Sequence, residues 1–174
     1  KWDMNWQLQQ DILLYSFSKE KSVIESHGTI DGDFSNPHFS IQIKAQSEPR
    51  FAKVKKVLIQ LSGDLANQAL TASVKLHHKK IFLKIKGQLR NQQWNGILSQ
   101  LTFIFDHNNQ WQLTKPTALS VKKDAVDIMP LCFSSTQAGN ACLQATWSNK
   151  KISGNINIHI TRFAPLLSAT SNAD

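Results

Sequence analysis

The sequence contains no apolar run of about 18 residues, so no segment is expected to cross a membrane as a helix. The motifs of common enzymes are also missing: there is no G-x-S-x-G elbow, no glycine-rich phosphate loop and no dinucleotide fingerprint. Acidic residues number 12 against 20 Lys and Arg, and no pair of them suggests the cleft that acid–base catalysis needs. We therefore predict that the protein is not an enzyme and uses no cofactor.

The metal-ligating residues are too few and too scattered for a metal site. Six histidines are present, but none is paired at ligand spacing with a second His, a Cys or a carboxylate. The two cysteines alone cannot complete a zinc site. We predict no bound metal.

The two cysteines, Cys132 and Cys142, flank a turn-like stretch whose midpoint is Gln137. If the two arms form a hairpin about that midpoint, the sulfur atoms face each other and a cross-strand disulfide is sterically possible. The alternative is two reduced, buried cysteines that pack as small apolar side chains. An even number at short spacing across a turn favours the disulfide, and a disulfide implies an oxidising compartment.

Positive charge exceeds negative charge, with a formal net charge of +8. Basic runs such as Lys53–Lys56 and His77–Lys80 are spread along the chain and interleaved with apolar residues, unlike a nucleic-acid footprint. On alternating strands this pattern is typical of a solvated outer face. The alternative is attraction to an anionic partner, with phospholipid head groups favoured over DNA. We predict no nucleic-acid partner.

Helical periodicity is missing from the body of the chain, and only residues 163–167 are a candidate for a short C-terminal helix. Polarity instead alternates with a period of two, as in Phe39–Ala45 and Val57–Leu61. Turn-forming stretches such as Ser35–Pro37 separate these runs. Many short strands at such spacing predict an all-β, antiparallel meander.

A five-residue unit, apolar–x–Gly–x–apolar, recurs inside the alternating runs. With a side-chain period of two, its glycine shares a face with its apolar neighbours, so that face is apolar but locally lacks a side chain. Such a face must be buried, and without helices the sheet can close into a barrel, fold over as a sandwich or curl into a trough. The repeated glycines favour strong curvature around an incompletely filled interior. These glycines are Gly32, Gly63, Gly87, Gly96 and Gly154.

The last third of the chain carries an ordered succession of short motifs. They are Trp94-x-Gly96-x-Leu98, Trp111–Thr114, Leu119–Val121, Pro130–Cys132, Ala141–Leu143, Trp147 and Ile156–Phe163. This succession resembles the C-terminal conserved region of the TamB family, the inner-membrane subunit of the translocation and assembly module of diderm bacteria. The resemblance is clearest over residues 85–167, and the first 80 residues share only the glycine units.

The resemblance implies a long protein that is anchored in the inner membrane and extends across the periplasm. It implies repeats that form a long curled sheet, an open U-shaped trough called a β-taco, with an apolar concave face. It also implies a role in outer-membrane biogenesis with a TamA-like outer-membrane protein as partner of the full-length parent. We expect residues 1–174 to be one β-taco segment excised from such a protein, with edge contacts to neighbouring repeats of the same chain.

The predicted function is an apolar groove that shields lipid acyl chains during phospholipid transport to the outer membrane. Removing a methylene group from water contributes a favourable free energy of about 0.8 kcal/mol, which amounts to roughly 12 kcal/mol for an acyl chain of about 16 carbons. The alternative is a chaperone or scaffold that shelters the strands of outer-membrane β-barrel proteins. The predicted wall residues of the groove are Ile41, Ile43, Val57, Ile59, Leu61, Val74, Leu83, Ile85, Leu101, Phe103, Leu113, Val121, Ile156 and Ile158.

Overall fold

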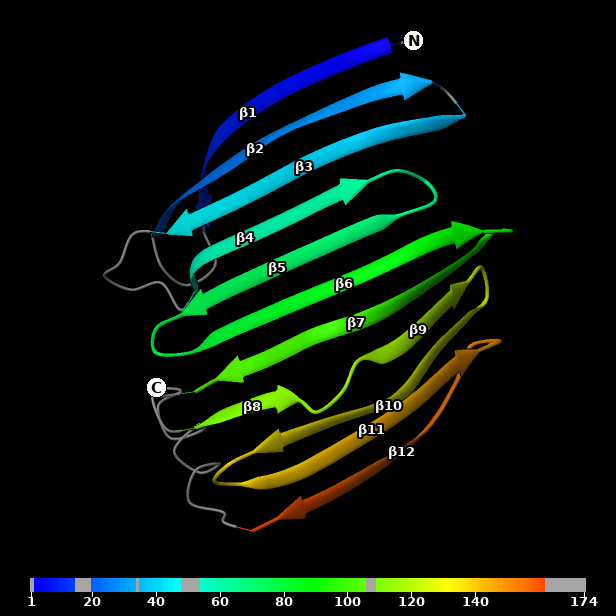
Figure 1. Ribbon diagram of the computed structural model, residues 1–174. Coiled ribbons are helices and arrows are strands. Elements are labelled where there is room, and N and C mark those ends of the chain that lie inside the picture. The colour runs from blue at the N-terminus through cyan, green and yellow to red at the C-terminus, as the bar shows by residue number, and fades with distance from the viewer. Residues whose placement is uncertain (1, 15–19, 34, 48–53, 106–108, 162–174) are drawn as a thin grey trace.

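The computed structural model of the protein describes residues 2–14, 20–33, 35–47, 54–105 and 109–161. Every helix or strand in these ranges is a β-strand, and the strands form one 12-stranded antiparallel sheet (Figure 1). The all-β, antiparallel prediction is confirmed, while the predicted helix at residues 163–167 lies outside the described residues. The strands are β1 (Trp2–Leu14), β2 (Glu20–Asp33), β3 (Asn36–Ser47), β4 (Val54–Gly63), β5 (Gln68–Leu76), β6 (Lys80–Arg90), β7 (Gln93–Ile104), β8 (Gln110–Leu113), β9 (Thr117–Lys122), β10 (Ala125–Ser135), β11 (Gly139–Ser148) and β12 (Lys151–Ile160).

The strands follow one another through the sheet almost in chain order. Each strand from β1 to β8 pairs with the next, and the sheet continues through β10, β11 and β12. Among the described residues, β1 and β12 make no contact with each other, so this part of the sheet is open and is not a barrel. The sheet also forms a single layer there, which excludes a sandwich.

Strands β8 and β9 share one position in the sheet, between β7 and β10. The interruption between them includes Pro116, which has no N–H to donate to a neighbouring strand. On the β10 side, the Thr114 N–H donates to the Cys132 carbonyl at 2.9 Å. The Thr117 hydroxyl donates to the Pro130 carbonyl at 3.2 Å. These bonds keep the interrupted strand attached to β10 and the sheet continuous.

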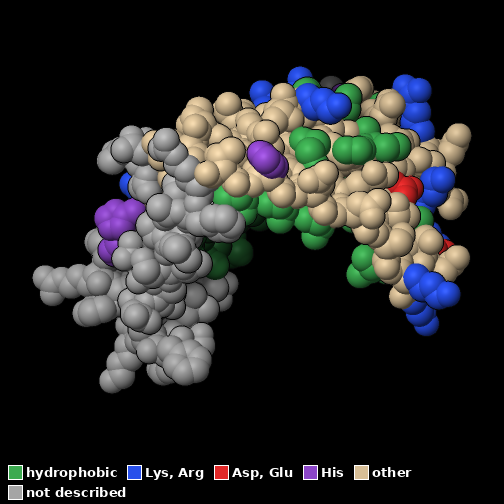
Figure 2. Space-filling view, turned by 90° about the horizontal axis from the view of Figure 1, so that it is seen from below, with side chains coloured by type: hydrophobic (Ala, Val, Ile, Leu, Met, Phe, Trp, Pro, Cys, Tyr) green, Lys and Arg blue, Asp and Glu red, His purple; other side chains and the backbone are tan. Residues whose placement is uncertain are grey.

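The strand register sorts the side chains onto two faces of different polarity. Ile43 lies opposite Ile59, Ile59 opposite Ala72, Ala72 opposite Leu83, and Leu83 opposite Leu101. Since side chains alternate along each strand, this register places the apolar residues of neighbouring strands on the same face. Figure 2 shows that the sheet is arched, with hydrophobic side chains gathered on its underside and most Lys and Arg side chains on its outer side. We call these the concave and the convex face.

The concave face is not covered by a second layer of described residues. Element contacts in the described part occur only between strands that are neighbours in the sheet. The buried apolar residues there are accordingly few: Leu98, Trp111 and Ala138. A sheet normally buries its apolar face against another layer, so an uncovered one needs a functional explanation.

Candidate functional site

The predicted wall residues all belong to the concave face. The pairing shows this strand by strand: Ile41 lies opposite Leu61, Val57 opposite Val74, and Leu83 opposite Leu101. The same rows continue to the far end of the sheet, where Leu113 pairs with Phe133, Phe133 with Ala141, and Ala141 with Ile158. The remaining wall residues have the same parity as these in their strands, namely Ile43, Ile59, Ile85, Phe103, Val121 and Ile156.

The wall residues are half-buried or exposed, so their side chains leave a free apolar surface. In the middle of the sheet, Ile59 and Leu83 are half-buried between their cross-strand neighbours. At the β12 end the exposed fraction rises to 71% for Ile156, 57% for Ile158 and 80% for Ile152. Figure 2 shows the hollow under the arch that this face lines. The geometry is that of a long open groove running across the strands.

The groove has further members that are absent from the predicted set. Leu70 pairs with Leu61 and Ile85, and Ile81 pairs with Val74. In the C-terminal part, Phe133 contacts Phe103 with ring centroids 5.7 Å apart. The signal for these residues was the same alternation that identified the others. Further members of the groove are Leu70, Ile81, Leu98, Leu119, Ile128, Phe133 and Leu143.

Four of the recurring glycines lie in one row across the concave face. Gly63 pairs with Gln68, Gln68 with Gly87, and Gly87 with Gly96. The row passes through β9, β10 and β11 to Gly154 in β12. We call Gly63, Gly87, Gly96 and Gly154 the glycine row. The glycine row therefore leaves one line across the concave face without Cβ atoms.

The indole of Trp94 lies over the glycine row where β6 meets β7. A Cβ atom placed on either Gly87 or Gly96 would overlap this ring. The Trp94 Nε1–H donates to Gln68 Oε1 at 2.6 Å, which orients the ring across the strands. Both glycines are therefore required by the close approach of the ring and not by an unusual backbone angle. Trp94 fills the missing side-chain volume and keeps this part of the groove wall apolar.

The disulfide lies on the opposite, convex face. Cys132 of β10 and Cys142 of β11 pair directly and are joined by an S–S bond, which confirms the predicted pairing. Their neighbours Phe133 and Ala141 point to the concave face. The disulfide thus ties two strands together without placing its sulfur atoms on the wall of the groove.

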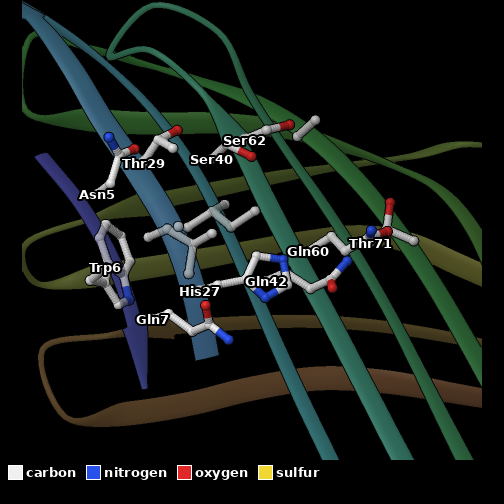
Figure 3. A pocket seen from close by; sticks show the side chains of 14 residues that line it. Asn5, Trp6, Gln7, His27, Thr29, Ser40, Gln42, Gln60, Ser62 and Thr71 are labelled. Carbon is white, nitrogen blue, oxygen red and sulfur yellow. The ribbon is translucent and has the colours of Figure 1, made fainter. Parts of the chain in front are cut away.

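The convex face carries a hollow of its own, with a volume of about 750 Å³ over strands β1 to β5 (Figure 3). Two rows of polar side chains border it, because the residues between them direct their side chains to the other face. Ile41 and Leu61, whose side chains belong to the apolar groove, also line this hollow. The rows in Figure 3 are Gln7, His27, Gln42, Gln60 and Thr71, and Asn5, Thr29, Ser40 and Ser62.

Basic residues lie at both margins of the sheet. At the margin formed by hairpins β4–β5, β6–β7, β9–β10 and β11–β12, carboxylates such as Asp64 and Asp124 accompany Arg90 and Lys122. At the opposite margin, the β5–β6 hairpin His77–Lys80 carries only basic and histidine side chains. Elsewhere on the convex face Lys44 Nζ forms an ion pair of 3.0 Å with Glu25.

Neither a metal site nor a membrane-spanning helix is found in the part of the chain that the structure describes. No group of three His, Cys, Asp or Glu side chains there could hold a metal ion. No helix in that part has the length and apolar character needed to cross a membrane. The feature left to explain is the apolar groove.

Comparison with known proteins supports a family assignment. Residues 50–168 match the family model of the TamB N-terminal domain, whereas no curated protein and no solved structure matches. The predicted placement in the C-terminal conserved region is not confirmed. Because similar alternating units recur along such sheets, these motifs identify the family better than the position within it. Proteins of this family are anchored in the inner membrane, extend into the periplasm and take part in outer-membrane assembly and lipid transport with a TamA-type partner. The matched residues include every strand from β4 to β12, and the chain therefore belongs to the TamB family.

Proposed function

We propose that this chain is a periplasmic, non-enzymatic segment of a lipid conduit, in which the concave groove shields the acyl chains of phospholipids. The observation that supports the proposal is the continuous apolar face across the sheet, with no second layer of described residues over it. An uncovered apolar surface of this extent marks a site where another apolar body is bound.

The dimensions of the sheet suit an acyl chain. Neighbouring strands lie about 4.8 Å apart, so four of them span roughly 15 Å across the strands. That length is about half the thickness of the hydrocarbon core of a bilayer, which is the extent of one leaflet of acyl chains. Each methylene kept from water contributes about 0.8 kcal/mol. Since apolar contact is non-directional, a chain can move from one set of strands to the next without breaking specific bonds.

Photo-crosslinking in the full-length parent tests this function. We would place a photoreactive residue at Ile59 or Leu83 on the concave face, and at Gln60 or Lys84 on the convex face of the same strands. The expected result is phospholipid adducts from the concave positions and none from the convex ones. Equal labelling of both faces by lipid, or no lipid adduct at any concave position, would rule the conduit out.

A second candidate is a chaperone or scaffold for strands of outer-membrane proteins, and the state of β12 favours it. The other side of this strand pairs with no described strand, and its inward side chains Ile152, Ile156 and Ile158 are 80%, 71% and 57% exposed. An extended client strand could pair with this edge and continue the groove. A neighbouring repeat of the same protein would fit the edge in the same way. Polypeptide adducts from Ile156 and Ile158, in place of lipid, would favour this candidate.

A further inference from the structure

Three lysines form a ladder on the convex face of the central strands. Lys56 of β4 pairs with Lys75 of β5, and Lys75 pairs with Lys80 of β6. All three are exposed. Directly opposite residues on adjacent strands have Cβ atoms about 4.5–5.5 Å apart, and like charges in this arrangement destabilise the sheet. We call Lys56, Lys75 and Lys80 the lysine ladder.

Neither charge pairing nor protection of a sheet edge explains the lysine ladder. No carboxylate among the described residues forms an ion pair with any of the three, although Lys44, in neighbouring β3, is paired with Glu25. Lysines that prevent edge-to-edge aggregation belong on edge strands, whereas β4, β5 and β6 lie inside the sheet. An anion bound to the three ammonium groups would offset this repulsion.

The lysine ladder lies at the margin of the apolar groove. The row of wall residues beside the lysines is Val57, Val74 and Ile81, which pair in the same order, and the apolar pair Val54 and Leu76 lies one step nearer to the margin. Each lysine is one residue nearer to the margin than its wall residue and points to the other face. Long lysine stems can follow an apolar surface while the ammonium group stays in water. Across this margin the surface therefore changes from apolar to cationic over one residue. A phospholipid changes over a similarly short distance from its apolar acyl chain to its anionic phosphate.

We propose that the lysine ladder binds the phosphate of a phospholipid head group whose acyl chain lies on Val57, Val74 and Ile81. This inference rests on the proposed function and adds an anchor for the head group along the groove. Anionic phospholipids are expected to bind more tightly than zwitterionic ones, because their net charge is not cancelled by an ammonium group.

Binding of the 174-residue chain to vesicles tests the ladder against a matched control. The test variant is Lys56→Gln, Lys75→Gln and Lys80→Gln, and the control is Lys84→Gln, Lys86→Gln and Lys122→Gln, which removes the same charge from exposed convex positions outside the ladder. With phosphatidylglycerol–phosphatidylcholine vesicles, the test variant should bind at least about tenfold more weakly than the control. With pure phosphatidylcholine vesicles, in which the choline ammonium cancels the phosphate charge, the difference between the two variants should be smaller. Equal weakening of both variants on anionic vesicles would overturn the proposal.

Two further measurements separate this inference from the proposed function. A fluorescent long-chain alkyl ester without phosphate should bind the wild type and the test variant alike. If the wild type binds no alkyl ester, the proposed conduit function is overturned. If the wild type binds the ester but the test variant and the control bind anionic vesicles equally, only the inference about the lysine ladder is overturned. The test variant should also melt at the same or a higher temperature, because it loses like-charge repulsion. A lower melting temperature would mean that the lysines are bound within the fold, and it too would overturn the inference.

Discussion

The concave and convex faces of this sheet share one backbone but have opposite surfaces. Along β4, Ile59 faces the apolar groove while Gln60 faces outward, and this alternation continues on β5 with Ala72 and Thr71. The convex face meets water as an ordinary outer face does. The concave face meets no second layer of described residues. The comparison indicates that the candidate function lies in the uncovered apolar face. The side chains on either face are ordinary when each is taken by itself.

The largest difference between the faces should come from a carboxylate placed on each. Ile59→Asp puts a charge on the groove wall and should weaken binding of a fluorescent long-chain alkyl ester at least about tenfold, since an unpaired charge beside hydrocarbon is costly. Gln60→Asp, one residue away on the convex face, should leave that binding unchanged. Equal binding by the two variants would show that the faces do not differ in the way proposed. Circular dichroism of both variants checks that the sheet is retained.

Loss of the disulfide should lower stability without changing the groove. Replacing both Cys132 and Cys142 by Ala removes a link between β10 and β11 and should reduce the free energy of unfolding by about 2–3 kcal/mol on the loop-entropy model. Denaturant titration measures this change. Alkyl-ester binding in the absence of denaturant should match the wild type, because the link lies on the convex face. If the folded variant no longer binds the alkyl ester, the disulfide would instead be needed to maintain the shape of the groove.

A smaller loss of stability is expected from filling the space between Gly87 and the Trp94 ring. Gly87→Val forces a side chain into the space of the Trp94 ring and should cost about 1–3 kcal/mol of unfolding free energy. In a chain that carries Trp94→Ala, the same Gly87→Val change should cost much less, because the ring is then absent. Thermal unfolding of the two single variants and the double variant gives the coupling between the positions. Additive losses would show that Trp94 is not what requires the glycine.

The sequence was a good guide to the fold class and to which residues of one strand lie on the same face of the sheet. Ile41 and Ile43 occupy alternate positions of one run, and this period of two holds for any strand whatever its partners. The cysteine pairing could be predicted for a similar reason, because Cys132 and Cys142 flank a single hairpin. Placement within the family was less accessible, since motifs that suggested the C-terminal region belong to a stretch that matches the N-terminal domain.

The sequence by itself determined that the chain forms antiparallel strands with one apolar and one polar side, because alternation is a local property of an extended backbone. Only the tertiary structure decided which residues of different strands stand together. It aligned the glycine row, placed the Trp94 ring on it, brought Lys56, Lys75 and Lys80 into register and left the described part of the sheet open. These features depend on the register between strands and on how curvature adds up from one strand pair to the next, and neither is encoded in the period of a single strand.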